Sequence, residues 1–414
     1  MVTTASLEPV ASRHSIGTDF RSVWLAVVVS STGDGMFLTA FPLLAAMLTR
    51  DPVLIAGVTI STRLPWLLFS LVTGAIADRM DRRKLMIGAD LLRVIIVGLL
   101  AAAIITDVVN IWQLFICAFL LGVCETLHVN AAQGIIPAIV QPADLLSANA
   151  RFVSGQIVSA QFIGPPLGVA LFSISTSLPF VVDAVSFAGS AAIIATVPDK
   201  HGVEKPETRF RDDIIEGLRF TIGNKPLLRL TEIMAFINFF YFAAISLLVL
   251  YNVDILGGNK TTFMALSVGA ASGTVMSRFY IKRSTARFGV TNTMLISMWL
   301  WALATVGLAA TSNALVAIGT MVILGFGTGL WITLNTTLRQ QLTPTRLLGR
   351  MNAASRMISW GVVPFGAAFG GIAARILGLR GPFILSAASM VLCALFGARL
   401  LRPIKSAVAV LEAN

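Results

Sequence analysis

The chain has 414 residues, of which 56% are hydrophobic and only 12% are charged, and its formal net charge is +11. Soluble domains carry roughly 25% charged residues, so this composition excludes a soluble globular protein and predicts a polytopic membrane protein. The positive charge is explained by basic loops that fix the topology in a bilayer, and no nucleic-acid partner is expected.

Apolar runs bounded by charges, Pro or Gly predict twelve membrane-spanning helices. Residues 1–20 are expected to be a cytoplasmic tail, and the first apolar run is too long for a signal peptide and has no cleavage site after it. Residues 21–197 hold six spans, 198–226 form a hydrophilic cytoplasmic linker, 227–402 hold six more, and 403–414 form a cytoplasmic tail. The predicted spans are 21–48, 53–77, 85–106, 110–136, 146–173, 177–197, 228–252, 260–281, 290–310, 313–338, 351–374 and 380–401.

The distribution of Lys and Arg supports this count. With the N-terminus inside, 25 basic residues fall on the cytoplasmic side and 4 outside, while Arg63 and Arg93 lie within spans. An error of one span would scramble this asymmetry. The expected location is therefore the inner (cytoplasmic) membrane, with both termini in the cytoplasm.

The two halves of the chain resemble each other. The segment from Leu121-Gly122 to Asn149 is echoed from Leu324-Gly325 to Asn352, and each is followed by a span rich in Gly and Pro. A duplicated six-helix unit is typical of transporters whose substrate site lies between two moving halves. The expected fold is an all-α membrane protein with twelve transmembrane helices in two pseudo-symmetric six-helix bundles.

A charged hairpin separates spans two and three, with six charges in the seven residues from Asp78 to Lys84. Asp78 ends its helix, where the dipole disfavours an anion, so it needs a partner such as the start of span eleven near Gly349–Arg350. The basic residues are explained as solvated charges that set topology. We predict a conformational latch made of Gly74, Asp78, Arg79, Arg82, Arg83 and Lys84, together with Asp90 and Arg93, which lie one turn into span three and pair with each other or join this network.

The hairpin, the two-times-six layout and the linker together resemble the major facilitator superfamily. Its signature loop runs Gly, three residues, Asp-Arg, one residue, Gly and then basic residues. Asp81 stands in place of the second Gly, and Asp tolerates positive φ better than most residues. The resemblance implies that Asp78 locks the outward-facing state.

Further motifs narrow the resemblance to the drug:proton antiporter branch that holds macrolide-efflux and siderophore-exporter proteins. They are Gly33-Asp34-Gly35 in span one, Asp90 to Arg93 in span three and Pro179 to Asp183 in span six. The antiporter signature of span five is partly kept. Its helix-packing residues Gly164, Pro165 and Gly168 fit, whereas Ala160 and Val169 replace glycines. The resemblance implies export in exchange for protons.

Ionisable groups inside a membrane are costly, so each is expected to be paired, to face a cavity or to act in function. Asp34 and Glu125 are candidates for proton coupling, with structural pairing, for instance to Arg63, as the alternative. His128 lies on the same helical face as Glu125, either as a third proton carrier or as the hydrogen-bonded neighbour of that carboxyl. Asp183 lies near the outer end of span six and favours a structural role.

The substrate cavity is expected to have aromatic walls with few polar groups, which suits bulky amphipathic ligands better than a sugar or nucleotide. Each wall residue is also compatible with plain packing. The candidates are Arg63, Gln156, Gln161, Asp183, Asn238, Tyr241, Trp331, Asn335 and Trp360.

The sequence thus predicts a secondary transporter that exports amphipathic drugs or natural products by proton antiport with alternating access. The alternative is a dedicated exporter or flippase of one metabolite such as a siderophore or lysolipid, and a more remote one is a non-transporting membrane receptor. A Gly-x-x-x-x-Gly-Lys-Ser/Thr loop is missing, and no metal cluster or catalytic constellation is visible, so we expect neither an enzyme nor a cofactor or metal. The three cysteines lie in apolar runs as buried side chains, and a monomer in the lipid bilayer is expected.

Overall fold

The computed structural model describes residues 17–141, 144–197, 210–344 and 347–413, and within these helices it leaves the side chains of several residues undescribed. The first half contains α1 (Thr18–Leu48), α2 (Pro52–Arg79), α3 (Arg82–Ile105), α4 (Ile111–Ile139), α5 (Leu145–Val158), η2 (Ser159–Ile163), α6 (Gly164–Ile174) and α7 (Leu178–Ala195). The linker contributes α8 (Phe210–Gly223). The second half contains α9 (Lys225–Ile245), α10 (Leu248–Leu250), η3 (Tyr251–Ile255), α11 (Lys260–Phe288), α12 (Val290–Ala310), α13 (Ala314–Gln341), α14 (Leu348–Gly361), α15 (Val363–Leu377), α16 (Gly381–Leu395), α17 (Gly397–Leu400) and α18 (Arg402–Ala413).

The described part of the chain is helical, and ten stretches in it are long and apolar enough to cross a membrane. Two further predicted spans fall on α11 and α16. The helix α11 has 29 residues but is less apolar than the others, and α16 is apolar but has only 15 residues. The architecture is that of an all-α, multi-pass membrane protein, as the apolar runs predict.

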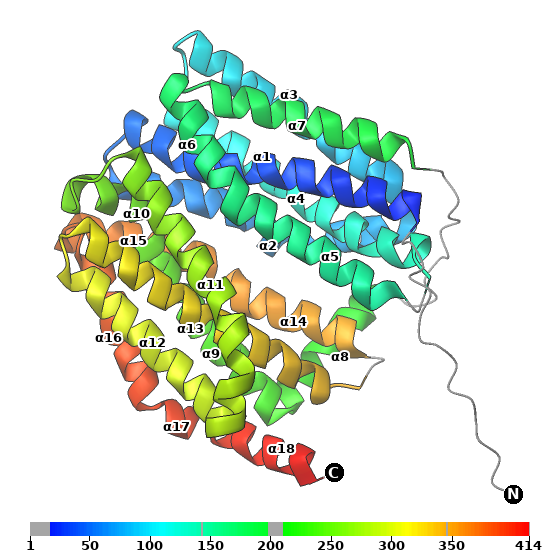
Figure 1. Cartoon of the computed structure of the whole chain (residues 1–414), viewed down its shortest axis with the longest axis vertical. Coiled ribbons are helices and arrows are strands. Elements are labelled where there is room, and N and C mark those ends of the chain that lie inside the picture. The colour runs from blue at the N-terminus through cyan, green and yellow to red at the C-terminus, as the bar shows by residue number, and fades with distance from the viewer. Residues whose placement is uncertain (1–16, 142–143, 198–209, 345–346, 414) are drawn as a thin grey trace, which may run out of the picture.

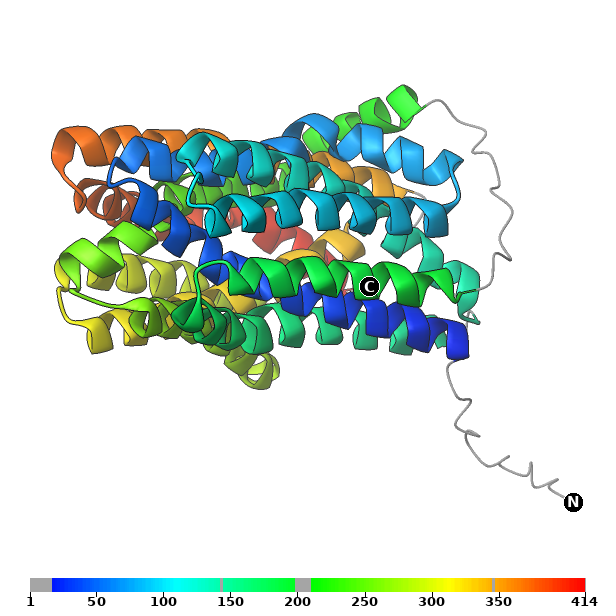
Figure 2. The same cartoon turned by 90° about the horizontal axis from the view of Figure 1, so that it is seen from above.

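The helices of the two halves form two neighbouring groups (Figure 1), with α1 to α7 in blue to green and α9 to α18 in light green to red. They run roughly parallel to one another when seen from above (Figure 2). In the first group α1 packs on α6 and α7, α2 on α4, and α3 on α4 and α7. In the second, α11 and α12 pack on α13, α15 packs on α9, and α16 packs on α9 and α12.

The fifth spanning segment of each half is interrupted in the same way. In the first half, a π-helical turn, η2, separates α5 from α6, which has Pro165 in its first turn. In the second half, Val362 separates α14 from α15, which has Pro364 in its first turn. A proline lacks the N–H that would continue the hydrogen-bond ladder, so both breaks follow from the Gly/Pro-rich sequences that the repeat places there.

Two segments expected to be a plain linker and a plain tail contain helices. The helix α8 packs against α14 and α9 (Figure 1). The helix α18 packs on α9 and α12, with Ile404 and Val408 buried one turn apart. The spacing of these apolar residues gives α18 one apolar face. This periodicity predicts a helix, whereas the charge of the segment indicates only that it lies outside the membrane.

The two halves touch at the end of the molecule where α1 meets α2, which we call the closed end. Arg50 forms an ion pair of 3.4 Å with Asp254 of η3. The ammonium group of Lys260 in α11 lies 3.4 Å from the Phe172 carbonyl oxygen and 4.9 Å from the Phe172 ring centre in α6. Gly371 of α15 packs directly on the first turn of α2. These contacts close the space between the halves at this end.

Candidate substrate and proton site

The glycines on either side of Asp34 let α1 approach two other helices closely. A Cβ atom at Gly33 would collide with the Asp183 and Ser186 side chains of α7, and one at Gly35 would lie 2.5 Å from the Ala160 carbonyl oxygen of η2. These two contacts fix the register of α1 against its neighbours. As a result, Asp34 is held half-buried in the middle of α1, between α4 and α7.

The residues of the span-five motif complete this close packing. A Cβ atom at Gly164 would lie 2.5 Å from the Gly35 Cα, and one at Gly168 would lie 2.7 Å from the Met36 carbonyl oxygen. Pro165, between them, lines the cavity of about 390 Å³ that is described below. The motif thus places α6 against the same stretch of α1 that carries Asp34.

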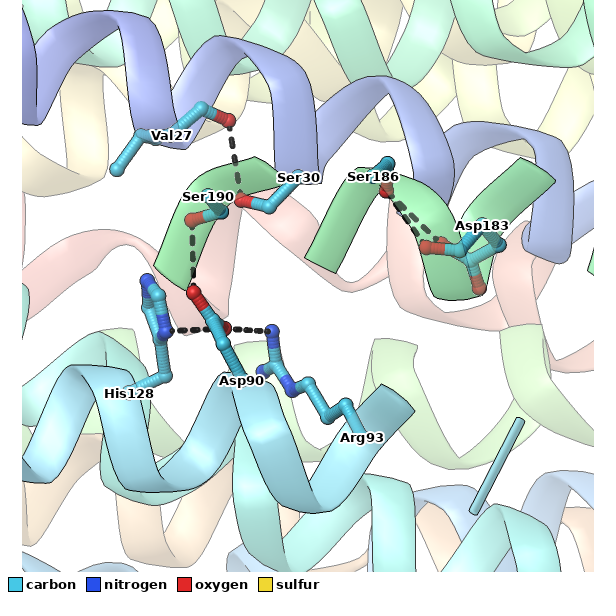
Figure 3. A network of polar contacts seen from close by, with 8 residues as sticks. All are labelled: Val27, Ser30, Asp90, Arg93, His128, Asp183, Ser186 and Ser190. Atoms are coloured by element: carbon cyan, nitrogen blue, oxygen red, sulfur yellow. Dashed lines mark hydrogen bonds and ion pairs between the residues drawn. The ribbon is translucent and has the colours of Figure 1, made fainter. Parts of the chain in front are cut away.

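A buried polar cluster centres on Asp90, whose side chain is inaccessible to solvent. Its Oδ2 accepts a 2.7 Å hydrogen bond from Ser190 Oγ of α7, and its Oδ1 lies 2.9 Å from His128 Nδ1 of α4 and 3.6 Å from Arg93 Nη1 (Figure 3). Arg93 also lies 4.9 Å from the centre of the Phe187 ring. The cluster therefore ties α3, α4 and α7 together with a carboxylate that is paired on both oxygens.

This arrangement corrects the expected neighbour of His128. His128 pairs with Asp90 of α3, whereas Glu125 accepts a 3.3 Å hydrogen bond from Trp66 Nε1 of α2. The spacing of Glu125 and His128 places them on one side of α4, but the helices packed against that side supply their partners. Trp66 was not among the predicted site residues. The one sequence signal for it is its position one helical turn after Arg63, which places both side chains on the same side of α2.

A cavity of about 260 Å³ lies between the two halves and brings the mid-membrane charges together. Its first-half wall holds Asp34, Glu125 and Asp183, with Arg93 and Arg63, and its second-half wall holds Phe242, Ile245 and Ser246. Three carboxyl groups and two guanidinium groups thus share an otherwise apolar space. Asp183 accepts a hydrogen bond of 3.4 Å from Ser186 Oγ and faces the cavity at the same time.

A smaller cavity of about 60 Å³ lies next to it, and it is lined by Asp34, Arg93, Glu125, His128 and Gln156. Asp34, Glu125 and Arg93 belong to both cavities, so they stand at the boundary between them. A larger cavity of about 390 Å³ also lies between the halves and includes Gln161 and Tyr241 among mainly apolar residues. Aromatic and aliphatic walls with a few polar groups are what an amphipathic ligand requires.

Arg63 and Trp360 lie together at the contact between α2 and the second half. The Arg63 guanidinium lies 5.9 Å from the centre of the Phe242 ring and 5.7 Å from that of the Trp360 ring. Among the residues that the structure describes, no carboxylate lies within ion-pair distance of Arg63, so the expected pairing with Asp34 or Glu125 is not formed.

Three predicted cavity residues lie elsewhere. Trp331 is fully buried against Trp301, with the ring centres 5.4 Å apart, and Asn335 is buried one turn further along α13. Asn238 donates a 2.6 Å hydrogen bond to the Ser359 carbonyl oxygen and so links α9 to α14. None of the three lines the cavities between the halves, because the faces that carry them point into the packed second half.

The charged hairpin has more specific contacts than solvated charges would have. Asp81 caps α3 by accepting hydrogen bonds from the backbone N–H groups of Arg83 and Lys84, and its φ of −59° makes the expected tolerance of positive φ irrelevant. Arg83 donates to the carbonyl oxygens of Ile194 and Ala195, which end α7. A basic side chain at a helix C-terminus satisfies its last carbonyl groups, so Arg83 has a structural role beyond topology.

The predicted latch is described only in part. The side chains of Asp78 and Arg79 and the packing of Gly74 lie outside the described residues. Arg350, near the expected partner of Asp78, forms an ion pair with Glu216 of α8, and the side chains of Arg82 and Lys84 lie at the start of α3. Asp90 and Arg93 pair with each other inside the first half, as one of the two alternatives predicts.

Two kinds of candidate site receive no support as chemical centres. The described residues contain no group of three or more His, Cys, Asp or Glu side chains arranged to hold a metal ion. Cys117, Cys124 and Cys393 are buried, unpaired thiols within helices.

Comparison with known proteins gives one family match and several full-length relatives. Residues 8–413 match the family model described as transmembrane secretion effector. The chain is 22% identical over 384 residues to macrolide efflux protein A of Streptococcus pyogenes, covering 90% of this chain and 93% of that protein. It is 24% identical over 394 residues to the multidrug efflux pump Tap of Mycolicibacterium fortuitum, covering 89% and 92%.

Solved structures show the same fold. A bacterial homologue of the human lysosomal transporter Spinster, inward-facing and unoccupied, superposes with a TM-score of 0.72 at 16% identity, covering 95% of this chain and 98% of that one. A bacterial homologue of the iron transporter ferroportin, in an inward-facing state, gives a TM-score of 0.73 at 15% identity, covering 94% and 100%. At these identities the likeness concerns the fold alone.

Proposed function

Because the chain belongs to the transmembrane secretion effector family of the major facilitator superfamily, we propose that it exports amphipathic drugs or natural products across the inner membrane in exchange for protons. The efflux proteins to which it is similar along most of its length support export of such molecules. The observation that carries the proposal is the cavity between the halves, where Asp34, Glu125 and Asp183 face an apolar space large enough for part of a drug-sized ligand.

The position of Asp34 and Glu125 at the boundary of two cavities supports the proposed proton coupling. A carboxyl group that meets water from one side in one state and from the other side in the next can take up a proton and release it across the membrane. A proton moving down the membrane potential supplies about 2.3 kcal/mol per 100 mV, which can drive a solute the other way. Asp90 is less suited to this exchange, because both of its oxygens are already paired.

Alternating access requires that one end of the cavity is closed while the other is open. The contacts of Arg50 with Asp254 and of Lys260 with Phe172 join the halves at the closed end. With both termini in the cytoplasm, the closed end faces outward and this conformation is inward-facing. The Spinster and ferroportin homologues with a similar fold are inward-facing, which is compatible with that assignment.

The test uses purified protein in liposomes with a macrolide, erythromycin, as the solute. Addition of erythromycin is expected to release protons, and an imposed pH gradient is expected to drive its transport. Asp34→Asn and Glu125→Gln should abolish both responses, alone or together, whereas Asp107→Asn is a matched control in an exposed loop. If both site variants transport erythromycin against a gradient at the normal rate, the coupling assignment is wrong.

We also propose that Asp78 acts as the latch at the cytoplasmic end, by binding the start of α14 in the outward-facing state. Asp78→Asn should then shift the protein toward the inward-facing state. The measurement is the accessibility of engineered cysteines on each side of the membrane. Equal accessibility in the variant and the parent would contradict a latch.

A further inference from the structure

Arg63 differs from the other guanidinium group in the cavity between the halves. Arg93 is neutralised by Asp90 at 3.6 Å and is almost fully buried. The contacts of Arg63, by comparison, are the faces of two aromatic rings contributed by the second half. A guanidinium held over ring faces keeps its N–H groups at the edge available for hydrogen bonds. In the part of the chain that the structure describes, no carboxylate takes up those donors within ion-pair distance.

The opposite wall of the same cavity carries a second group that lacks a partner. Ser246, which directly follows α9, lines this cavity and the 390 Å³ cavity. Its hydroxyl oxygen is buried and has no hydrogen-bond partner among the described residues. A buried hydroxyl without a partner costs free energy, which a ligand atom that binds it would recover.

We propose that Arg63 and Ser246 form an anion-binding subsite of the transport cavity, so that the preferred substrates are amphipathic molecules carrying a carboxylate, sulfonate or phosphate group. The subsite takes one donor set from each half of the molecule, and the surrounding apolar walls take the body of the ligand. Planar guanidinium groups match the geometry of such oxyanions and bind them through two parallel hydrogen bonds. This inference rests on the proposed export function and specifies its substrate class.

The carboxyl groups of the cavity do not oppose this assignment, because two of them have other contacts. Glu125 accepts from Trp66, and Asp183 accepts from Ser186. Both lie with Asp34 on helices α1, α4 and α7, whereas Arg63 lies on α2 against the second half. A cationic substrate such as erythromycin, whose amine is protonated at neutral pH, would instead be drawn to the carboxyl side of the cavity, so the subsite predicts that it binds more weakly than an anionic amphiphile. Preference for a cation is the alternative that the test must separate.

The test compares two dyes with the same ring system and different charge. The dye 8-anilinonaphthalene-1-sulfonate carries a sulfonate group, and N-phenyl-1-naphthylamine lacks it and is neutral. Equilibrium dialysis of the full chain in nanodiscs, against empty nanodiscs, gives the dissociation constant of each dye and subtracts partition into lipid. The variants are Arg63→Gln, Arg63→Lys and Ser246→Ala, with Arg375→Gln as a control at an exposed arginine of α15.

The parent protein is expected to bind the sulfonate at least tenfold more tightly than the neutral dye. Arg63→Gln should weaken sulfonate binding by about tenfold or more and leave the neutral dye unchanged, because a charge-assisted pair is lost. Arg63→Lys should keep part of the preference, and Ser246→Ala should weaken sulfonate binding by about fivefold. Retained binding of the neutral dye shows that each variant is folded.

The possible failures are distinguishable. If the parent binds both dyes and Arg63→Gln changes neither constant, or both by the same factor, the anion subsite is wrong while the amphipathic cavity stands. If the amphipathic cation tetraphenylphosphonium binds more tightly to the parent than the sulfonate does, the carboxyl side selects the substrate and the subsite is again wrong. If the parent binds none of the three probes, the export of amphipathic molecules loses its support together with the subsite.

Discussion

The closed end depends on the absence of a side chain at Gly371. A Cβ atom at this position would lie 2.9 Å from Ala56 Cβ, 3.1 Å from Val53 Cα and 3.2 Å from the Pro52 carbonyl oxygen. Carbon atoms in contact prefer separations of about 3.5–4.0 Å, so any substituent here must push α15 away from α2. Gly371→Val is therefore expected to destabilise the closed arrangement relative to the one in which this end is open.

The size of the effect follows from packing. Overpacking of a well-packed contact costs about 1–3 kcal/mol, and the backbone of α2 lies too close for a side-chain rotation to relieve it. If the cost falls on the closed state alone, the ratio of closed to open molecules drops by a factor of about 5 to 150. A protein that is mostly closed at this end would become substantially open.

Double electron–electron resonance measures this shift directly. Spin labels are placed at two exposed positions, Val108→Cys in the connection between α3 and α4 and Leu315→Cys in the first turn of α13. The three buried native cysteines are replaced by alanine. Gly371→Val should move the distance distribution to longer values, whereas Gly319→Val, at an exposed glycine of α13 with open space around it, should not. A folded Gly371→Val protein with the parental distribution would refute the argument that this contact closes the molecule.

Three other substitutions test individual contacts. Ser190→Ala removes a 2.7 Å charge-assisted hydrogen bond to the fully buried Asp90 and should lower the free energy of unfolding by about 1.5–3 kcal/mol. The measurement is the melting temperature in detergent. The control Ser173→Ala, at an exposed serine, should lower the melting temperature less. Arg50→Gln should change the spin-label distances little, because both partners of its ion pair with Asp254 are about half exposed and such pairs contribute about 0.2–1 kcal/mol. A shift as large as that of Gly371→Val would show that this ion pair contributes as much to closure as the packing at Gly371. Arg83→Gln should speed amide hydrogen exchange at the end of α7, because the carbonyl oxygens of Ile194 and Ala195 lose their side-chain donor. If this variant exchanges at the same rate as the control variant Arg21→Gln, at an exposed site, the contact does not stabilise the end of α7.

The sequence predicts the architecture well because bilayer thickness and charge asymmetry act on long stretches of chain. Span-length apolar runs and the clustering of Lys and Arg are sufficient to predict α11 and α16 as spans, although one is less apolar and the other shorter than the rest. The helix α11 contacts α13 and α6 and lines the 390 Å³ cavity through Phe263 and Ser267. Gly269 and Gly273 pack closely on α13, and Ser267 and Thr274 line the cavity, so the small and polar residues that lower the hydropathy of α11 are placed at contacts within the protein.

The partners of the site residues could not be read in the same way. Helical spacing correctly places Glu125 and His128 on one side of α4, but His128 binds Asp90 because α3 packs there, and Glu125 binds Trp66 because α2 does. Packing partners that the sequence does not reveal also explain why Trp331 and Asn335 were wrongly predicted to line the cavity. Their polarity pointed to a cavity, but the face of α13 that carries them is packed inside the second half.

The contact between α2 and α14 joins the carboxyl groups to the other half of the molecule. Arg63 of α2 lies over the Trp360 ring of α14, and Arg356 of α14 lies 5.7 Å from the centre of the Trp66 ring of α2. The same Trp66 donates its indole N–H to Glu125. If Glu125 gains or loses a proton, the strength of that hydrogen bond changes, and with it the position of the ring on which Arg356 rests. Under the proposed antiport, proton binding in the first half therefore reaches the second half through a direct contact, and no long pathway is required.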